Sequence, residues 1–586
     1  MSNKGVFLVN DFIKLQEEKI SIALNELGYH VDQVKLNVSS MPDLSDYQYN
    51  GAMSLAKEQH KNPREIAQEI VKKMDKEDIE KITVDGPGFI NITFKNESLV
   101  NYIDKYTLNK YENNDIKVVM DYGGPNVAKA LHVGHLRSAN IGEALKRLAR
   151  FLGYNVTSDI HLGDWGRPLG LVILELKKRH PDWVYFDENY TGKYPNEDPV
   201  TNKELEELYP FASNRAKEDE SYLEEARVIT TKLQNKEKGY YDLWKKIVKV
   251  SVDNIKYLYD KLNVSFDLWN GESDSDQYVL DVVKYLEDNN YTRISENAEV
   301  VDVAMPDDKL EIPPLLLIKS NKSVSYETTD LATIWDRVHS INPNQIWYVV
   351  DNRQSLHFEQ VFRTCYKSKI VGESVKLEHL GFGTMNGKDG RPFKTRDGSV
   401  MTLESLIKLV KDETLKKMNK EYTDEEKNSI ADDLSIAALK YADLLPVRST
   451  DYIFDVEKFC DLNGKTGVYL LYSVVRMKSL IKKAKEKDIS YNKLSTIKGQ
   501  QDRDVLIKLL QVDNILNKSM EDKSLNYVTD YLYQLAKVYN SFYDSNKVLV
   551  ESNKELQESW LILTSKVIQV MSVLIDILGI NIPDKI

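Results

Sequence analysis

The spacing of apolar residues divides the chain into three regions. Residues 1–110 combine helix-like and strand-like patterns, which predict a small α/β domain. Residues 111–425 alternate short apolar runs with amphipathic helices, as in a doubly wound parallel sheet, and insertions near 177–240 and 285–325 interrupt this rhythm. Residues 426–586 have helical spacing almost throughout, which predicts an all-α bundle.

Individual elements follow from the same patterns. In the first region we expect helices over residues 12–27 and 65–74, and strands over 82–84 and 89–94. Residues 46–50 bring polar groups and aromatics together, which predicts a loop. Helices of the bundle are predicted over residues 434–445, 468–485, 505–516, 527–543 and 556–578.

One stretch, residues 116–153, joins a strand to a helix through a glycine-bearing turn. His132-Val-Gly-His135 stands where an amphipathic helix begins. A helix N-terminus supplies unpaired backbone N–H groups and the positive end of a dipole, and both favour phosphate. Gly134 allows a ligand to approach the backbone closely. The stretch therefore predicts a nucleotide site, the alternative being two histidines that only cap the helix.

Composition and charge mainly exclude classes of protein. The chain has 586 residues, 42% hydrophobic and 29% charged, as in a globular protein of several domains. Its net charge of -12 argues against a non-specific DNA-binding protein, although local basic faces can still hold RNA. No apolar run approaches about 18 residues and no signal peptide is evident, so we expect a cytoplasmic protein without a membrane partner. Cys365 and Cys460 are too few for a cysteine zinc site, and no structural metal is expected.

Two predicted buried strands are each followed by polar side chains. The apolar run 313–318 comes shortly before Tyr326 and Asp330, and the run 345–350 comes shortly before Gln354. Ligands of doubly wound sheets bind beyond the carboxyl ends of the strands, so these residues are pocket candidates. The alternative for a lone acid in such a place is a helix cap.

A glycine-punctuated basic loop, residues 387–398, precedes a predicted helix over residues 403–417. Loops of this composition are often only solvated turns. Flexible glycines would also allow Lys394 and Arg396 to close over a polyphosphate as an anion clamp. Composition alone leaves both roles open.

In their order along the chain, these motifs resemble the arginyl-tRNA synthetases, a family of class I aminoacyl-tRNA synthetases. The resemblance rests on the His-x-Gly-His signature, on Arg391-Pro-Phe-Lys394-Thr at the second class I signature, and on the spacing of the pocket candidates. Further matching segments are His161-Leu-Gly-Asp-Trp-Gly166, Asp85-Gly-Pro-Gly-Phe-Ile-Asn91 and Gly464-Lys-Thr-Gly-Val-Tyr-Leu-Leu-Tyr472. The sequence departs from the family pattern at Gly123, where serine is common, and at Ile586, where methionine is common.

The resemblance implies a fold and a reaction. The fold is α/β, with a class I Rossmann-type catalytic domain, an N-terminal α/β tRNA-binding domain and a C-terminal all-α anticodon-binding bundle. The reaction activates L-arginine with ATP, accompanied by Mg2+, to give arginyl-adenylate and pyrophosphate. Arginine is then transferred to the 3′ end of tRNA(Arg) with release of AMP. The resemblance also implies a monomer, and a requirement for bound tRNA before arginine is activated.

The resemblance assigns roles to residues of this chain. Contacts to ATP are implied for His132, Gly134, His135, Lys394, Lys129 and Arg396. Contacts to arginine are implied for Asn126, His135, Tyr326, Asp330, Gln354 and Glu272. Contacts to tRNA are implied for Tyr469, Tyr472, Arg476, Tyr543 and, at the tRNA elbow, Gln48. Asp330 is the expected main partner of the guanidinium, because a planar cation needs bidentate acceptors.

Two alternatives remain at this point. The first is another class I synthetase, of cysteinyl or glutamyl type, which the low cysteine content and the acidic pocket disfavour. The second is a catalytically inactive, tRNA-binding paralogue. Such a protein would be expected to have lost His132, His135 or Lys394, and all three are present.

Overall fold

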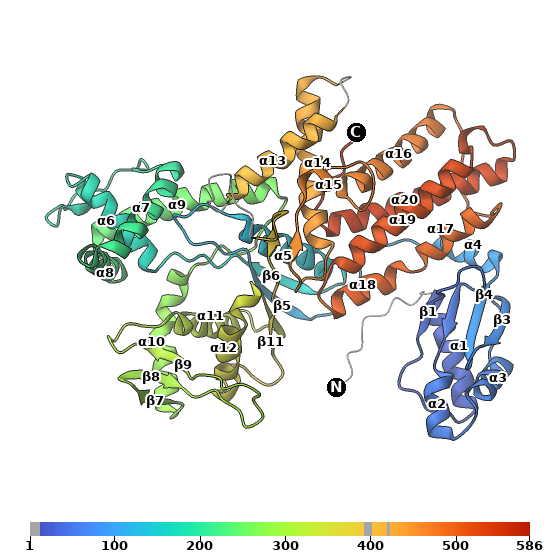
Figure 1. Ribbon diagram of the computed structural model, residues 1–586, viewed down its shortest axis with the longest axis horizontal. Helices are drawn as coiled ribbons and strands as arrows, with labels where there is room; N and C mark the ends of the chain where they lie inside the picture. The colour runs from blue at the N-terminus through green and yellow to red at the C-terminus, as the bar shows by residue number, and fades with distance from the viewer. Residues whose placement is uncertain (1–11, 392–400, 419–421) are drawn as a thin grey trace.

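The computed structural model describes residues 12–391, 401–418 and 422–586. In this part of the chain a parallel sheet occupies the middle, with two insertions on one side and a helical bundle on the other (Figure 1). A smaller domain built on a second sheet lies against the bundle. The predicted fold class is confirmed.

The N-terminal part folds as four antiparallel strands with helices packed against them. Its strand order is β1-β2-β4-β3, and its elements are α1 (Phe12–Glu26), β1 (Leu36–Val38), β2 (Tyr47–Tyr49), α2 (Ala52–Gln59), α3 (Pro63–Lys73), β3 (Ile79–Asp85), β4 (Phe89–Phe94) and α4 (Asn96–Lys105). The predicted helices and strands are present, but the loop predicted at residues 46–50 is wrong. Tyr47 and Tyr49 are buried side by side in β2, because alternating aromatics fit one face of a sheet.

A four-stranded parallel sheet forms the middle of the molecule. Its order is β11-β10-β5-β6, with β5 (Lys117–Tyr122), β6 (Asn155–Asp159), β10 (Gln345–Val349) and β11 (Lys376–His379). Helix α5 (Val133–Phe151) packs against β5, β6 and β10, and α12 (Ser355–Lys367) packs against β11 with α11 (Tyr326–Ser340) beside it. Helix α6 (Arg167–Arg179) follows β6 but packs against the helices of the first insertion (Figure 1). Both β5 and β10 are buried along most of their length, as strands covered on two faces must be. The chain leaves β5 toward β6 and later returns on the other side as β10, so a crevice is expected at their carboxyl ends.

Two insertions extend from the sheet on the side away from the bundle (Figure 1). The first is helical and consists of η1 (Val184–Phe186), α7 (Asn202–Glu218), α8 (Glu220–Gln234) and the start of α9 (Lys238–Lys261). The second follows α10 (Glu272–Asp288) and forms an antiparallel sheet of β7 (Thr292–Ser295), β8 (Ala298–Val301) and β9 (Leu315–Ile318). The apolar run 313–318 therefore contains a strand, but its predicted place in the doubly wound sheet is wrong, because β9 pairs with β8 in this separate sheet.

The last part of the chain is helical apart from a short parallel strand pair. The pair is β12 (Met385–Asn386) with β13 (Tyr452–Ile453), and the helices are α13 (Leu403–Lys417), α14 (Asp424–Leu444), α15 (Val456–Phe459), α16 (Gly467–Glu486), α17 (Gln500–Leu509), α18 (Val512–Glu521), α19 (Asn526–Ser545), η3 (Val548–Val550) and α20 (Lys554–Ile577). The single helix predicted over residues 505–516 is wrong, because the structure has two helices, α17 and α18, there. The Tyr531 hydroxyl donates to the Lys508 carbonyl at 2.9 Å, and such a side-chain donor interrupts a regular helical ladder.

The described residues include one helix, α20, that is long and apolar enough to cross a membrane by length and composition alone. It has 24 residues, and 56% of its most apolar window is buried inside the molecule. It packs against α16, α17 and α19 and against α5 of the central domain. These contacts are those of a core helix, and a core helix can be as long and as apolar as one that crosses a membrane.

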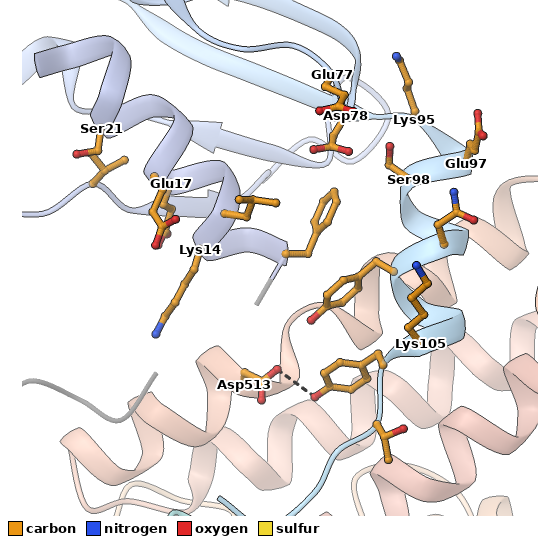
Figure 2. Close-up of a pocket in the computed structure, with 18 of the residues that line it drawn as sticks. Lys14, Glu17, Ser21, Glu77, Asp78, Lys95, Glu97, Ser98, Lys105 and Asp513 are labelled. Carbon is orange, nitrogen blue, oxygen red and sulfur yellow. Dashed lines mark hydrogen bonds between the residues drawn. The ribbon is translucent and has the colours of Figure 1, made fainter. Parts of the chain in front are cut away.

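Polar contacts join the N-terminal sheet domain to the bundle. Arg503 of α17 pairs with Asp46 at 2.5 Å. The hydroxyls of Tyr106 and Tyr111 both donate to Asp513 of α18, at 3.0 and 2.7 Å. A cavity of about 1470 Å³ lies at this junction, between α1, α4 and Asp513 (Figure 2). The two parts are therefore joined by direct side-chain contacts as well as by the chain itself.

Candidate active site

The N-terminus of α5 follows the carboxyl end of β5 and begins at two histidines. His132 is the N-cap, and its Nδ1 accepts from the backbone N–H of Gly134 at 3.0 Å. The backbone N–H of His132 donates to Nδ1 of His135 at 3.1 Å, and the two ring centroids lie 4.0 Å apart. Because both Nδ1 atoms accept hydrogen bonds, each ring is neutral and carries its proton on Nε2. The helix terminus thus presents two neutral N–H donors.

The surroundings lower the pKa of both imidazoles. Burial lowers the pKa of His135 to about 3, with further contributions from His132 and Lys129. Burial also lowers the pKa of His132, and the charges of Lys129 and Arg353 act in the same direction. Arg353, a cation that the sequence did not predict here, pairs with Asp351 at 2.7 Å in η2 (Asn352–Gln354), and 82% of its side chain is exposed. The cations around the histidines therefore come from two segments, the turn before α5 and η2.

Residues beside the histidines explain why the turn has this sequence. Lys129 Nζ lies 4.3 Å from the centre of the Tyr209 ring, on α7 of the first insertion. A Cβ on Gly134 would lie 2.8 Å from Cε1 of His132, so a side chain there would displace the ring. Gly123 has a φ of +73°, and a Cβ on it would lie 3.1 Å from the ring of Phe266. Glycine in place of the family's serine therefore suits this backbone.

The chain beyond the basic loop returns to the histidines. The N–H of Leu403 donates to the carbonyl of Leu131 at 2.8 Å, and the N–H of Val133 donates to Met401 at 3.3 Å. Lys394 and Arg396 themselves lie outside the described residues. Residues 401–403, which follow them in the sequence, nevertheless lie next to His132.

Three predicted pocket residues, Tyr326, Asp330 and Gln354, come together from two elements. The first two lie one turn apart on α11, and the Tyr326 hydroxyl donates to Oε1 of Gln354 at 2.9 Å. A fourth member, His357 of α12, was not predicted. Its Nε2–H donates to Oδ2 of Asp330 at 2.6 Å, and its ring stacks on Tyr326 with 4.4 Å between centroids. His357 therefore orients both the acid and the aromatic wall of the pocket.

Glu272, the first residue of α10, is a second acid near this pocket. Its pKa is raised to about 7, first by burial and then by the charges of Asp164 and Asp330, against the opposing effect of His161. A carboxyl group in this state is about half protonated at neutral pH. An incoming cation would favour its ionised form.

Asn126 lies in the turn between β5 and α5, with an exposed side chain. Its backbone pairs with that of Gly163. A Cβ on Gly163 would lie 2.3 Å from Oδ1 of Asn126, so glycine is what leaves room for this amide. The amide thereby stays in place at the carboxyl end of the sheet.

An arginine of the protein itself is buried two turns beyond Asp330 on α11. Arg337 pairs with Asp121 at 2.7 Å and with Asp159 at 2.8 Å, at the ends of β5 and β6. It also donates to the Tyr348 hydroxyl of β10 at 3.1 Å. Burial raises the pKa of Asp121, and the charge of Arg337 opposes that shift. This cluster, which the sequence did not predict, ties together the carboxyl ends of β5, β6 and β10.

Four of the five predicted tRNA contacts lie on α16 and α19 of the bundle. Tyr472 is 43% exposed. Tyr469 is partly buried, and its hydroxyl accepts from the bundle itself, from Asn540 at 2.8 Å. The guanidinium of Arg476 lies 4.0 Å from the centre of the Tyr543 ring. The structure therefore groups an exposed aromatic with a stacked arginine on neighbouring helices.

The fifth, Gln48, lies apart from the others on β2. It donates to Asn91 of β4 at 2.7 Å, and Asn91 donates to Asp85 at 2.8 Å. These side chains form a polar row across the sheet, on the face opposite the buried Tyr47 and Tyr49.

Three family descriptions match the chain, in order along its length. "Arginyl tRNA synthetase N terminal domain" matches residues 14–94, "tRNA synthetases class I (R), catalytic domain" matches 98–456, and "DALR anticodon binding domain" matches 470–586. The parallel sheet, the histidine-capped helix and the catalytic match together define a class I aminoacyl-tRNA synthetase.

Similar proteins narrow this class to one family. The chain is 45% identical over 567 residues to the arginine–tRNA ligase of Alkaliphilus oremlandii, covering 95% of this chain and 97% of that one. It is 42% identical to the arginine–tRNA ligase of Agathobacter rectalis, covering 98% and 99% of the two chains. The chain belongs to the arginyl-tRNA synthetase family. The crystal structure of arginyl-tRNA synthetase from Plasmodium falciparum has the same fold, with a TM-score of 0.82 at 23% identity over 99% of this chain and 100% of that chain.

Proposed function

We propose that this chain joins L-arginine to tRNA(Arg) with ATP, and that the reaction takes place at the carboxyl ends of β5 and β10. One observation carries the assignment: an acidic, aromatic pocket and a helix N-terminus with two neutral N–H donors flank the same strand ends. Ser138 of α5 donates to the carbonyl of Val349 in β10 at 2.7 Å, which ties the two halves together. The pocket fits a guanidinium and the helix terminus fits a polyphosphate.

In the first step, the arginine carboxylate attacks the α-phosphorus of ATP. An O–P bond forms, and the bond to the departing pyrophosphate breaks. No protein nucleophile is required, so the site has to orient the reactants and stabilise charge on the phosphoryl oxygens. We assign the Nε2–H groups of His132 and His135 to phosphate and ribose contacts, with His135 also near the arginine. The dipole of α5 stabilises the negative charge on the phosphoryl oxygens, and Gly134 allows the phosphate to approach the backbone closely.

Cations complete the ATP half of the proposed site. Lys394 is assigned to the pyrophosphate, with Lys129 and Arg396 as supporting charges, and Arg353 is a further candidate.

In the second step, a hydroxyl of the terminal tRNA ribose attacks the carbonyl carbon of arginyl-adenylate. The new ester bond forms as the mixed anhydride breaks and AMP leaves. Donors aimed at the phosphate then stabilise the leaving group.

Selection of arginine follows from the geometry of its side chain. A guanidinium offers parallel N–H groups that a carboxylate can accept in pairs, whereas the lysine ammonium lacks this fork. Asp330, already oriented by His357, is assigned as that carboxylate. The remaining arginine contacts are assigned to Tyr326, Gln354, Glu272 and, for the α-groups, Asn126.

The raised pKa of Glu272 predicts that arginine binding releases a proton. Below pH 7 the carboxyl is mostly protonated, and the guanidinium favours the ionised form. The affinity for arginine is therefore expected to increase by about tenfold between pH 6 and pH 8. Calorimetric titrations in buffers of different ionisation enthalpy would measure the released proton. In Glu272→Gln the pH dependence should flatten, and an undiminished dependence in that variant would refute the assignment.

The exposed Tyr472 predicts a stacking contact with an unpaired tRNA base. Loss of one base–aromatic stack is worth about 1–3 kcal/mol. In Tyr472→Ala the KM for tRNA is expected to increase on the order of tenfold, with unchanged KM values for arginine and ATP. Aminoacylation kinetics at varied tRNA concentration would measure it. Tyr257→Ala is the matched control, since Tyr257 is 52% exposed but lies on α9, outside the bundle. Equal tRNA kinetics in the two variants would count against the contact.

The proposed function also involves a metal ion, an oligomeric state, a cellular location and a division into domains. Mg2+ enters as the counter-ion of the ATP phosphates, and among the described residues no group of three or more His, Cys, Asp or Glu is placed to hold a metal ion. We propose a monomer in the cytoplasm, with no membrane and no DNA among its partners. Domain boundaries are proposed after residues 110 and 425, with the tRNA elbow at the first domain and the anticodon at the last.

A charging assay tests the proposed function. Purified protein, ATP, Mg2+ and total tRNA are incubated with each of the standard amino acids in turn. We expect stable acylation with arginine alone. ATP–pyrophosphate exchange without tRNA tests the expected coupling separately, because robust exchange would exclude a requirement for bound tRNA. Charging with another amino acid, or with none, would refute the proposal.

A further inference from the structure

Helix α5, which begins at the histidines, carries one buried arginine that faces the bundle. Arg137 is 1% exposed, and its Nε lies 2.9 Å from Oδ1 of Asp443, which is equally buried on α14. Its Nη1 donates to the carbonyl of Gly383 at 2.7 Å and to that of Thr450 at 3.1 Å. One guanidinium therefore joins α5 to Gly383 and to the segment from Asp443 to Thr450, where α5 packs against α14 (Figure 1).

The carboxylate of Asp443 is held from several sides. It accepts from the Tyr452 hydroxyl at 3.0 Å and from the side chain of Asn140, also on α5, at 3.2 Å. The ring of Tyr452 lies 5.0 Å from the guanidinium carbon of Arg137. The ion pair is therefore fixed in direction as well as in distance, in a place from which water is excluded.

The segments that Arg137 joins lead to both halves of the proposed ATP site. Arg137 itself is the fifth residue of α5, which His132 caps. Gly383 precedes β12, and the basic loop follows that strand. Thr450 precedes β13, which pairs with β12. A displacement of Arg137 or Asp443 would therefore move the histidines relative to the root of the basic loop.

We propose that Arg137 and Asp443 form a positioning pair that sets the histidines of α5 at a fixed place relative to the root of the basic loop. The inference rests on the proposed assignment of both elements to ATP. It makes α14, the first helix of the bundle, part of the active-site scaffold. The pair lies outside the group of Tyr326, Asp330, Gln354 and Glu272, so its loss is expected to change turnover more than arginine binding. A displacement of about 1 Å between reacting groups is enough to lower a rate on the order of 10²-fold.

Three variants test the pair: Asp443→Asn, Arg137→Lys, and the double variant Arg137→Met with Asp443→Leu. The double variant removes both charges of the pair together, and such replacements of a buried ion pair are often neutral for stability. In arginine-dependent ATP–pyrophosphate exchange with tRNA present, kcat is expected to fall by about 30- to 100-fold. The KM for arginine should stay near the wild-type value. Thermal unfolding and circular dichroism report the folded fraction of each variant.

A neighbouring ion pair supplies the matched control. Arg147, on the same helix, pairs with Asp576 of α20 at 2.9 Å, and the Asp576 side chain is 74% exposed. Asp576→Asn is expected to leave kcat unchanged. A folded pair variant with wild-type kcat, or with a loss that only matches its folded fraction, would overturn the positioning role. His135→Asn, assayed in parallel, separates the two proposals: if it alone loses activity, only the pair's role is wrong, and if it too keeps activity, the histidine assignment is wrong.

Discussion

Replacing Asp330 with asparagine is expected to raise the KM for arginine by about 10²-fold, a loss of about 3 kcal/mol for a charged hydrogen bond in a partly buried pocket. The KM for ATP is expected to stay near the wild-type value, because the phosphate half of the site lies at the α5 terminus. Asparagine keeps an oxygen that can accept from His357, so the local packing should survive. Steady-state aminoacylation at varied arginine and varied ATP measures both constants.

Asp336→Asn is the matched control for this change. Asp336 is on the same helix, but it lies against Tyr278 of α10 rather than in the pocket. Arginine kinetics of this variant should match the wild type. An unchanged arginine KM in Asp330→Asn, or an equal increase for arginine and ATP, would contradict the guanidinium assignment.

Replacing His135 with asparagine is expected to lower kcat for arginine activation by about 10²- to 10³-fold, as loss of one donor to a charged transition state does. Asparagine retains an acceptor oxygen for the backbone N–H of His132. It removes the Nε2–H donor. The variant therefore separates capping from catalysis, and arginine-dependent ATP–pyrophosphate exchange with tRNA present measures the result.

Stability measurements complete this test. The midpoint of thermal unfolding should stay close to the wild-type value in His135→Asn. His339→Asn, at the exposed end of α11, is the control for a histidine outside the site and should leave kcat unchanged. Loss of stability without loss of kcat per folded molecule would mean that His135 only caps the helix.

Elements with strong local periodicity were predictable from the sequence, whereas elements decided by distant contacts were not. The helix after His135 and the strand at β10 carry their own apolar patterns. The loop predicted at residues 46–50 is instead a three-residue strand, which exists through its pairing with β1 and β4. At the break between α17 and α18 the carbonyl of Lys508 accepts from Tyr531, which lies 23 residues away in the sequence.

Some residues of the candidate site were likewise predictable from the sequence, and others were not. The types and spacing of Tyr326, Asp330 and Gln354 singled them out, and the structure brings their side chains together. The only signal for His357 was its position three residues after Gln354, and one histidine on a helix has no distinctive pattern. Arg137 and Asp443 lie 306 residues apart in the sequence, so no local pattern could predict their contact. Charge pairing across such distances is decided by packing.

The most direct measurement is a crystal structure of the protein with a non-hydrolysable arginyl-adenylate analogue, such as arginyl-sulfamoyl adenosine. We expect the guanidinium to lie against Asp330 and Glu272. We expect the sulfamoyl group, which stands in for the α-phosphate, within hydrogen-bonding distance of His132 or His135. An analogue bound elsewhere, or one whose guanidinium points away from Asp330, would contradict the proposed active site.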